Sequence, residues 1–307
     1  MRKYLTLLVM SLFFVATPCA RAGILYSDGF EPTDLAGADF YDSTTGNQGQ
    51  NISIVANGGG ALHLTAAHGS YYAEITNTDD AYSTANSLPS GYGQSVFTDY
   101  GYYRNGGTFD PISGQPLAPG VATSGAFYES TAFYIDAQNW APNSVAAQTA
   151  FWIDTTPYSD PASLDENNFR VTVPVTGTVQ VAAFVGNPGS NGPVATITSS
   201  GWYTFKTTFE NSGGFVSNTL SVIDSSGNVL GSYTGVSTLP FASLTGTNYG
   251  DWVTVWDNGF AGDVLGIDDV EVGTIPVPEP SSVIIGSLLA LVTAGGFRWR
   301  RDRKAAA

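Results

Sequence analysis

GWYTFKTTFE, residues 201–210, places aromatic and polar side chains alternately along the chain. Tyr203, Phe205 and Phe209 fall in one set, whereas Trp202 and Lys206 fall in the other. Successive side chains of a β-strand point to opposite faces, so this stretch has one largely apolar and one mostly polar face. It therefore predicts a strand whose apolar face is buried.

The chain around this stretch continues in the same manner. Residues 219–234, TLSVIDSSGNVLGSYT, predict a hairpin in which Asp224 and Gly227 supply the turn chemistry. Strand character recurs in ILYSDGFE, NISIVA, ALHLTA, AFYESTAFYID, QTAFWID, NFRVTV, VQVAAFV, DWVTVWDNG and DVLGIDDVEV. Short strands at regular spacing, without helical periodicity, indicate an all-β, jelly-roll-like antiparallel β-sandwich over residues 23–273.

The N-terminus has the pattern of a secretory signal peptide, residues 1–22. Arg2 and Lys3 precede an apolar run, and Ala20 and Ala22 form the small-residue pattern that signal peptidase recognises. Cleavage after Ala22 would remove the single cysteine, Cys19. The exported body would then contain no disulfide, and its stability would come from burial of a core.

The charges are distributed unevenly. The body carries three Lys or Arg residues against 24 Asp or Glu residues, a formal charge of −21, because most of the basic residues lie in the two end segments. Such a body repels nucleic acid and anionic lipid and attracts divalent cations. The same acidity can also serve only to keep an exported protein soluble.

The C-terminus combines a proline-rich spacer (274–282), an apolar segment (283–297) and a basic end (298–307). A helix over the apolar segment is long enough to cross a bilayer when its flanks are counted, and the basic end would stay in the cytoplasm. The charged residues of this basic end that would stop transfer across the membrane are Arg298, Arg300, Arg301, Arg303 and Lys304. On these residues alone, the protein would be a single-pass protein with its body outside.

The same tail resembles the PEP-CTERM sorting signal of Gram-negative bacteria, with the motif at Val277, Pro278, Glu279 and Pro280. In that family an exosortase processes the signal near the motif. The resemblance implies an inner-membrane intermediate and then a destination in the cell envelope, at the surface or in an extracellular matrix of exopolysaccharide and biofilm. A permanent anchor behind a proline linker is the alternative.

The body contains no recognisable catalytic constellation. The histidines, His63 and His68, belong to no G-x-S-x-G context and fall on opposite faces or in different elements. The E-x-D-x-x-E signature of β-sandwich glucanases is absent. We therefore expect no catalytic residues, no required cofactor and no enzyme activity. A glycan-active hydrolase with a dispersed carboxylate pair stays open.

The two ends of the body, ILYSDGFE and DVLGIDDVEVG, resemble the first and last strands of concanavalin-A-like and carbohydrate-module jelly rolls. In calcium-bearing members of that kind, acidic residues near both terminal strands share a structural Ca²⁺. The resemblance makes Asp28, Glu31, Asp268 and Asp269 candidate ligands, and carboxylate oxygens suit Ca²⁺. Asp268 and Asp269 can alternatively protect an edge strand by their charge.

Aromatic residues outside the strands are candidates for stacking on a sugar. Trp140 lies in a turn-like segment, and Tyr100, Tyr102 and Tyr103 lie in a long Gly-, Tyr- and Pro-rich stretch. That stretch can equally be an irregular excursion packed by its own tyrosines. Together, the residues predict an exported β-sandwich with a structural or glycan-binding role.

Overall fold

The protein is described from a computed structural model, which covers residues 24–31, 40–42, 52–76, 94–100, 126–140, 148–159, 162–163, 167–186, 190–244, 248–255 and 264–275. Nearly all of these belong to one compact unit, Ile24–Thr274. The signal peptide, the sorting motif, the apolar segment 283–297 and the basic end lie outside the described residues and stay predictions. Within the described residues, no helix is long and apolar enough to cross a membrane.

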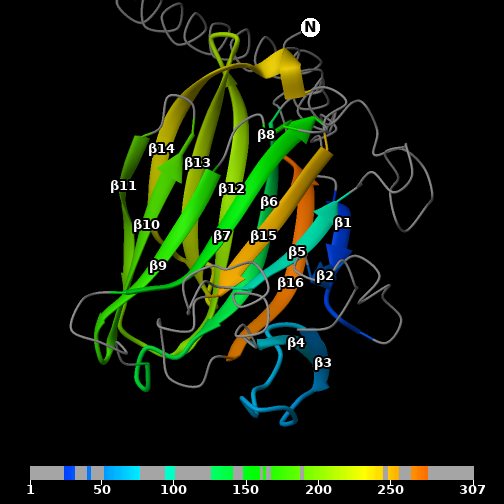
Figure 1. Ribbon diagram of the computed structural model, residues 1–307, viewed down its shortest axis with the longest axis vertical. Helices are drawn as coiled ribbons and strands as arrows, with labels where there is room; N and C mark the ends of the chain where they lie inside the picture. The colour runs from blue at the N-terminus through cyan, green and yellow to red at the C-terminus, as the bar shows by residue number, and fades with distance from the viewer. Residues whose placement is uncertain are drawn as a thin grey trace, which may run out of the picture. The chain divides into compact units, whose positions relative to one another are not determined.

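The described chain is built almost entirely of strands (Figure 1). Their bounds are β1 (Ile24–Asp28), β2 (Phe40–Asp42), β3 (Ile52–Ala56), β4 (Tyr71–Thr76), β5 (Gln94–Tyr100), β6 (Phe127–Ile135), β7 (Gln148–Ser159), β8 (Ala162–Ser163), β9 (Asn167–Val175), β10 (Thr178–Val185), β11 (Ser190–Ile197), β12 (Gly201–Ser212), β13 (Phe215–Asp224), β14 (Val229–Pro240), β15 (Asn248–Val255) and β16 (Val264–Thr274). One short 3-10 helix, η1 (Phe241–Leu244), follows β14.

The strands form two antiparallel sheets that stack face to face. Sheet A has the order β14-β13-β12-β6-β16-β4-β3, with β1 pairing β16. Sheet B has the order β11-β10-β9-β7-β15-β5-β2, with β8 pairing β7. Strands of both sheets contribute to one core between them. The predicted all-β, jelly-roll-like antiparallel sandwich is confirmed.

Strand β12 shows the predicted alternation. Tyr203, Phe205 and Phe209 are buried, whereas Trp202 and Lys206 are partly exposed. The strand is central in sheet A, paired with β13 on one side and β6 on the other. The sequence signal was clear because only one face of this strand enters the core.

Aromatic rings from both sheets interlock at the centre of the sandwich. Phe133 and Phe205 come from sheet A, and Phe151 and Phe169 come from sheet B. The Phe205 ring meets the Phe133 and Phe169 rings edge-on, with centroids 5.5 and 5.2 Å apart. Such edge-to-face pairs add stabilisation beyond the area that they bury.

The hairpin between β13 and β14 is closed by the residues that the sequence predicted. Asp224 Oδ1 accepts hydrogen bonds from the backbone N–H groups of Ser226 and Asn228, and Gly227 adopts a φ of 82°. The hydrogen bond from the Asn228 side chain, together with those from the backbone, lowers the pKa of the Asp224 carboxyl. The turn is therefore specified locally.

The strand predicted over ALHLTA is wrong. These residues lie in a loop that joins β3 to β4, here called the 57–70 loop. The buried Glu74 carboxylate accepts the N–H groups of Ala61 and Leu62, at 2.9 and 2.8 Å, so these donors are not available to a ladder. His63 has a φ of 53° and is exposed, with Nδ1 3.1 Å from the Gly58 carbonyl oxygen.

The 57–70 loop contacts the outer face of sheet A. The Trp202 indole N–H donates to the Thr65 carbonyl at 2.7 Å, and the Trp202 ring lies edge-on to Tyr72 and Tyr134. Trp202 occupies this outer layer because it alternates with the buried Tyr203. The loop thus gives this part of sheet A a cover of its own.

Further along the same outer face, Lys206 lies over an aromatic ring. Its Nζ is 3.5 Å from the centroid of the Tyr128 ring, and the Tyr128 hydroxyl donates to Glu271. Burial lowers the pKa of Lys206, which the Glu271 carboxylate partly offsets, and burial together with Glu271 raises the pKa of Tyr128. This arrangement is a cation–π contact beside a carboxylate.

Candidate functional site

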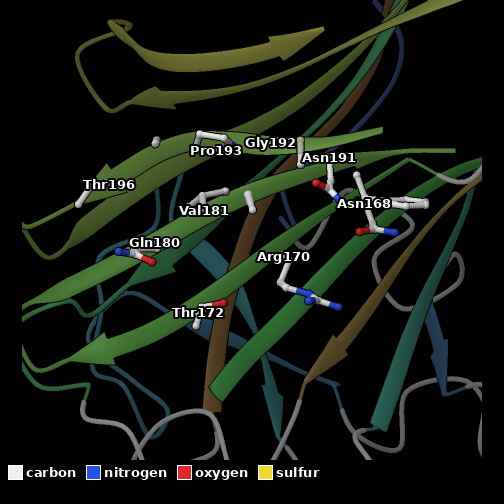
Figure 2. A pocket seen from close by; sticks show the side chains of 13 residues that line it. Asn168, Arg170, Thr172, Gln180, Val181, Asn191, Gly192, Pro193 and Thr196 are labelled. Atoms are coloured by element: carbon white, nitrogen blue, oxygen red, sulfur yellow. The ribbon is translucent and has the colours of Figure 1, made fainter. Parts of the chain in front are cut away.

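A groove of about 860 Å³ lies over three neighbouring strands of sheet B (Figure 2). Its floor is formed by β9, β10 and β11. On each of these strands, side chains that alternate with the exposed ones enter the core, among them Phe169, Val185 and Ile197. The groove therefore occupies the outer face of the sheet.

The strand register arranges the groove side chains in three rows. Asn191, Phe184 and Asn168 form the first row. The second contains Pro193, Ala182 and Arg170, and the third contains Thr196, Gln180 and Thr172. Figure 2 shows Asn191 and Asn168 at one end of the groove and Gln180 and Thr196 toward the other. Rows two residues apart along a strand are separated by roughly 7 Å.

The first row combines an aromatic ring with two amides. Phe184 is partly exposed at the middle of the row, although its neighbours Ala183 and Val185 are buried. An amide side chain offers both a donor and an acceptor, and an aromatic ring offers an apolar surface. This is the combination with which ligand sites commonly hold a flat molecule that carries hydroxyl groups.

The second row is open at its centre because Ala182 is small. Arg170, on one side of Ala182, is exposed, and Pro193 is exposed on the other side. A proline is tolerated at this position because β11 is the end strand of its sheet. The second row therefore places the Arg170 guanidinium beside the shallow space over Ala182.

The border of the groove is fixed by close contact between the two sheets. A Cβ at Gly231 of β14 would lie 1.9 Å from the Val194 carbonyl oxygen of β11. A Cβ at Gly192 would lie 2.4 Å from the Tyr233 ring. Only glycine permits such an approach of backbones. The edge of sheet B that limits the groove is thus held against sheet A.

The acidic residues predicted near the terminal strands meet at one loop. β1 pairs with β16, and Glu31 accepts the N–H groups of Ser70 and Tyr71. On the other side of this loop, Asp268 accepts the His68 N–H at 3.0 Å. Burial raises the pKa of Asp268 to about 6, although hydrogen bonds from backbone N–H groups oppose the shift.

Asp269 lies beside Asp268 in an irregularity of β16. It has a φ of 49°, and its Oδ2 is 3.0 Å from His68 Nδ1. Its N–H donates to Asp268 Oδ1 at 2.8 Å. Both oxygens of Asp268 therefore accept hydrogen bonds from N–H groups. Oε1 of Glu31 likewise accepts hydrogen bonds from two N–H groups.

This donor pattern differs from that of a cation site, in which carboxylate oxygens converge on one point. Among the residues that the structure describes, no group of three or more His, Cys, Asp or Glu side chains is placed to hold a metal ion. Asp28 lies at the end of β1, but its side chain is outside the description. Calcium stays a prediction. A fall in melting temperature on addition of a chelator would support it, and an unchanged one would exclude it.

Trp140 does not serve as a stacking platform. Its side chain is 4% exposed and meets the Phe151 ring edge-on in the core, so the prediction from its turn-like sequence is wrong. The segment ends a turn after β6, and the large apolar ring is buried there instead of facing solvent. Tyr100 belongs to β5, where no side chain is described, and Tyr102 and Tyr103 lie outside the described residues.

The groove residues were not singled out from the sequence, although Phe184 carries a signal. In TVQVAAFV, the positions that alternate with the buried valines hold Gln180, Ala182 and Phe184. An aromatic residue on the polar side of a strand is an exception to the alternation. The partners Asn168 and Asn191 could not be found in this way, since they depend on the pairing of three strands.

No family model matches this sequence, and no curated protein matches it. Among solved structures, the chain is similar to the CBM2 module of the evolved Dit protein of Lactobacillus casei BL23 phage J-1, with 10% identity and a TM-score of 0.41 over 84% of this chain and 98% of that chain. It is also similar to peanut lectin, with 10% identity and a TM-score of 0.36 over 78% and 98%.

A third similar structure is the β-glucanase of Bacillus licheniformis, with 10% identity and a TM-score of 0.36 over 80% of this chain and 96% of that chain. The neighbours thus include a carbohydrate-binding module, a lectin and a glycan-cleaving enzyme. The assignment of this chain to the antiparallel β-sandwiches rests on its own strand pairing.

Proposed function

We propose that this protein is an exported glycan-binding component of the cell envelope or extracellular polysaccharide matrix, sorted by a PEP-CTERM tail and without catalytic activity. The observation that carries the binding role is the groove on sheet B, where Phe184 lies between Asn168 and Asn191. An aromatic face between two amides suits a sugar ring, whose faces carry C–H groups and whose rim carries hydroxyls.

The composition of the groove favours binding over hydrolysis. Glycoside hydrolysis uses two carboxyl groups placed on either side of the scissile bond. Among the described residues that line the groove, none is an aspartate, a glutamate or a histidine. A hydrolase remains the second candidate function only through residues elsewhere in the chain.

Affinity electrophoresis with soluble polysaccharides tests the binding role. We expect the protein to be retarded by at least one of a neutral β-glucan, a galactomannan and a polygalacturonate. Phe184→Ala should weaken the retardation about tenfold, which corresponds to the loss of one stacking contact. The matched control is Phe215→Ala, since Phe215 is 46% exposed on β13 of the other sheet. Equal retardation of both variants would contradict a role for the groove.

The sorting role is tested by the intact mass of the protein recovered from its native host. We expect a form that begins at Gly23 and ends near Pro278–Pro280, produced by signal peptidase and an exosortase. Glu279→Ala should instead accumulate as a longer membrane form. A mass that still includes Ala307 in the wild type would mean that the protein is a permanently anchored surface protein.

A further inference from the structure

The groove lies in the longest part of the acidic body that contains no acidic residue. Residues 167–209 include Arg170 and Lys206 but neither aspartate nor glutamate, although the body carries 24 acidic residues. This interval supplies β9, β10, β11 and most of β12. Every described residue that lines the groove comes from it.

The two cations of this interval lie on different sheets. Arg170 belongs to β9, points to the outer face of sheet B and lines the groove. Lys206 belongs to β12 in sheet A and lies over the Tyr128 ring near Glu271. A ligand in the groove would therefore meet Arg170, and Lys206 provides an internal comparison for the effect of charge alone.

The neighbours of Arg170 on β9 and β10 are neutral, and on its other side Arg170 pairs with Trp152 of β7. Asn168 and Thr172 flank it two residues away along β9, and Ala182 is its register partner on β10. The third row adds Gln180 and Thr196, whose side chains are exposed. These groups can exchange hydrogen bonds with hydroxyls, whereas the guanidinium matches the two oxygens of a carboxylate.

We propose that the groove binds an anionic glycan, a chain that contains uronic acid, with Arg170 contacting its carboxylate and Phe184 contacting an adjoining sugar ring. This inference rests on the proposed function and specifies the ligand class of the same groove. Charge complementarity supports it, because β9, β10 and β11 carry no carboxylate; the acidic position nearest by register is Asp154 of β7, opposite Asn168. A charge-assisted, bidentate contact is also stronger than one to a neutral hydroxyl.

The overall charge of the body acts against an anionic polymer at long range. At physiological ionic strength, however, charges more than about 8 Å apart are largely screened. Contacts within the groove then depend mainly on the groups that line it. Binding is therefore to be measured at this ionic strength, in a buffer without calcium so that the polymer does not gel.

The test compares polygalacturonate with the same polymer after methyl esterification, which removes the charge and keeps the sugar backbone. We expect the wild-type protein to bind the acidic form at least about tenfold more tightly, the size of a charged hydrogen bond. Arg170→Gln should abolish this preference, and Arg170→Lys should retain part of it, since lysine keeps the charge but not the fork. Lys206→Gln, which makes the same change in charge outside the groove, should keep the preference.

Each other result overturns the inference. Equal, Phe184-dependent binding of both polymers would mean a neutral glycan site, and the proposed function would survive. An equal loss in Arg170→Gln and Lys206→Gln would mean unspecific attraction by charge. Failure to bind either of these polymers or the neutral ones would overturn the inference and the proposed binding function together. Unfolding curves of the three variants show whether a loss of binding comes from a loss of the fold.

Discussion

Trp202 and Phe184 are both aromatic residues on the outer face of a strand, one in each sheet, and their surroundings are opposite. Trp202 lies under the 57–70 loop, which the Glu74 carboxylate holds through two backbone N–H groups. Phe184 lies in an open groove between amides, with no carboxylate among the described lining residues. An acidic residue thus holds the cover of one sheet, whereas the described residues that line the groove on the other sheet include none.

The largest loss of stability is expected when a core aromatic residue is truncated, compared with the same truncation on the outer face of a sheet. Phe205→Ala should cost about 3–5 kcal/mol of unfolding free energy, because Phe205 is 2% exposed and contacts rings from both sheets. Phe184→Ala, the same chemical change on the outer face, should cost much less and act on glycan binding instead. Urea denaturation measures both. Similar losses of stability would show that Phe184 is a core residue.

The next largest effect is a pH dependence of stability caused by Asp268, which contacts the 57–70 loop. Burial raises the pKa of Asp268 from 3.8 to about 6, so the folded state binds this proton more tightly than the unfolded state. Stability from this group is complete below about pH 4 and falls as the pH rises through 6, by about 3 kcal/mol for a shift of roughly two units.

Asp268→Asn should remove this part of the pH dependence. The measurement is the unfolding free energy of both proteins between pH 4 and pH 7. Because other carboxyl groups also titrate in this range, the difference between the two curves is the informative quantity. A difference that does not change with pH would contradict the assignment to Asp268.

A smaller loss of stability is expected when Glu74, which holds the 57–70 loop, is replaced. In Glu74→Gln, one of the two oxygens that accept the Ala61 and Leu62 N–H groups becomes an amide nitrogen. The loss of a charged acceptor should cost about 1.5–3 kcal/mol. Hydrogen exchange should become faster within the loop, while polysaccharide binding in the groove should not change. Slow exchange in the variant would mean that the Trp202 contact alone holds the loop.

The smallest loss of stability is expected at Lys206, further along the outer face of sheet A. Lys206→Gln removes the cation–π contact with Tyr128, worth about 0.5–1 kcal/mol at a partly exposed site. It also removes the cost of partly burying a charge, which lowers the net loss. Thermal unfolding beside the wild type measures the difference, and a loss of several kcal/mol would indicate a further role for this lysine.

The parts of the fold that were predicted from sequence are those that depend on local pattern. The alternation of Tyr203 and Phe205 specifies β12, and Asp224 with Gly227 specifies the turn after β13. The pattern failed over ALHLTA, because a carboxylate 12 or 13 residues away, Glu74, takes the backbone donors. Such a competition between distant groups leaves no periodic trace.

The candidate site was harder to predict for the same reason. Glu31, Asp268 and Asp269 come from the two ends of the body and all contact residues 68–71, while their role as calcium ligands stays a prediction. That meeting followed from the pairing of the terminal strands. The groove depends on the registers of three strands, and Asn191 has no local feature that separates it from a loop asparagine.

The scarcity of basic residues also bears on resistance to proteolysis. Proteases of the trypsin type cut after lysine and arginine, and residues 23–273 offer them only Arg104, Arg170 and Lys206. Arg170 and Lys206 lie in strands that are paired on both sides, β9 and β12. At these two positions cleavage requires opening of the sheet, so its rate follows the opening equilibrium. The interval that forms the groove is thereby also protected against this class of protease.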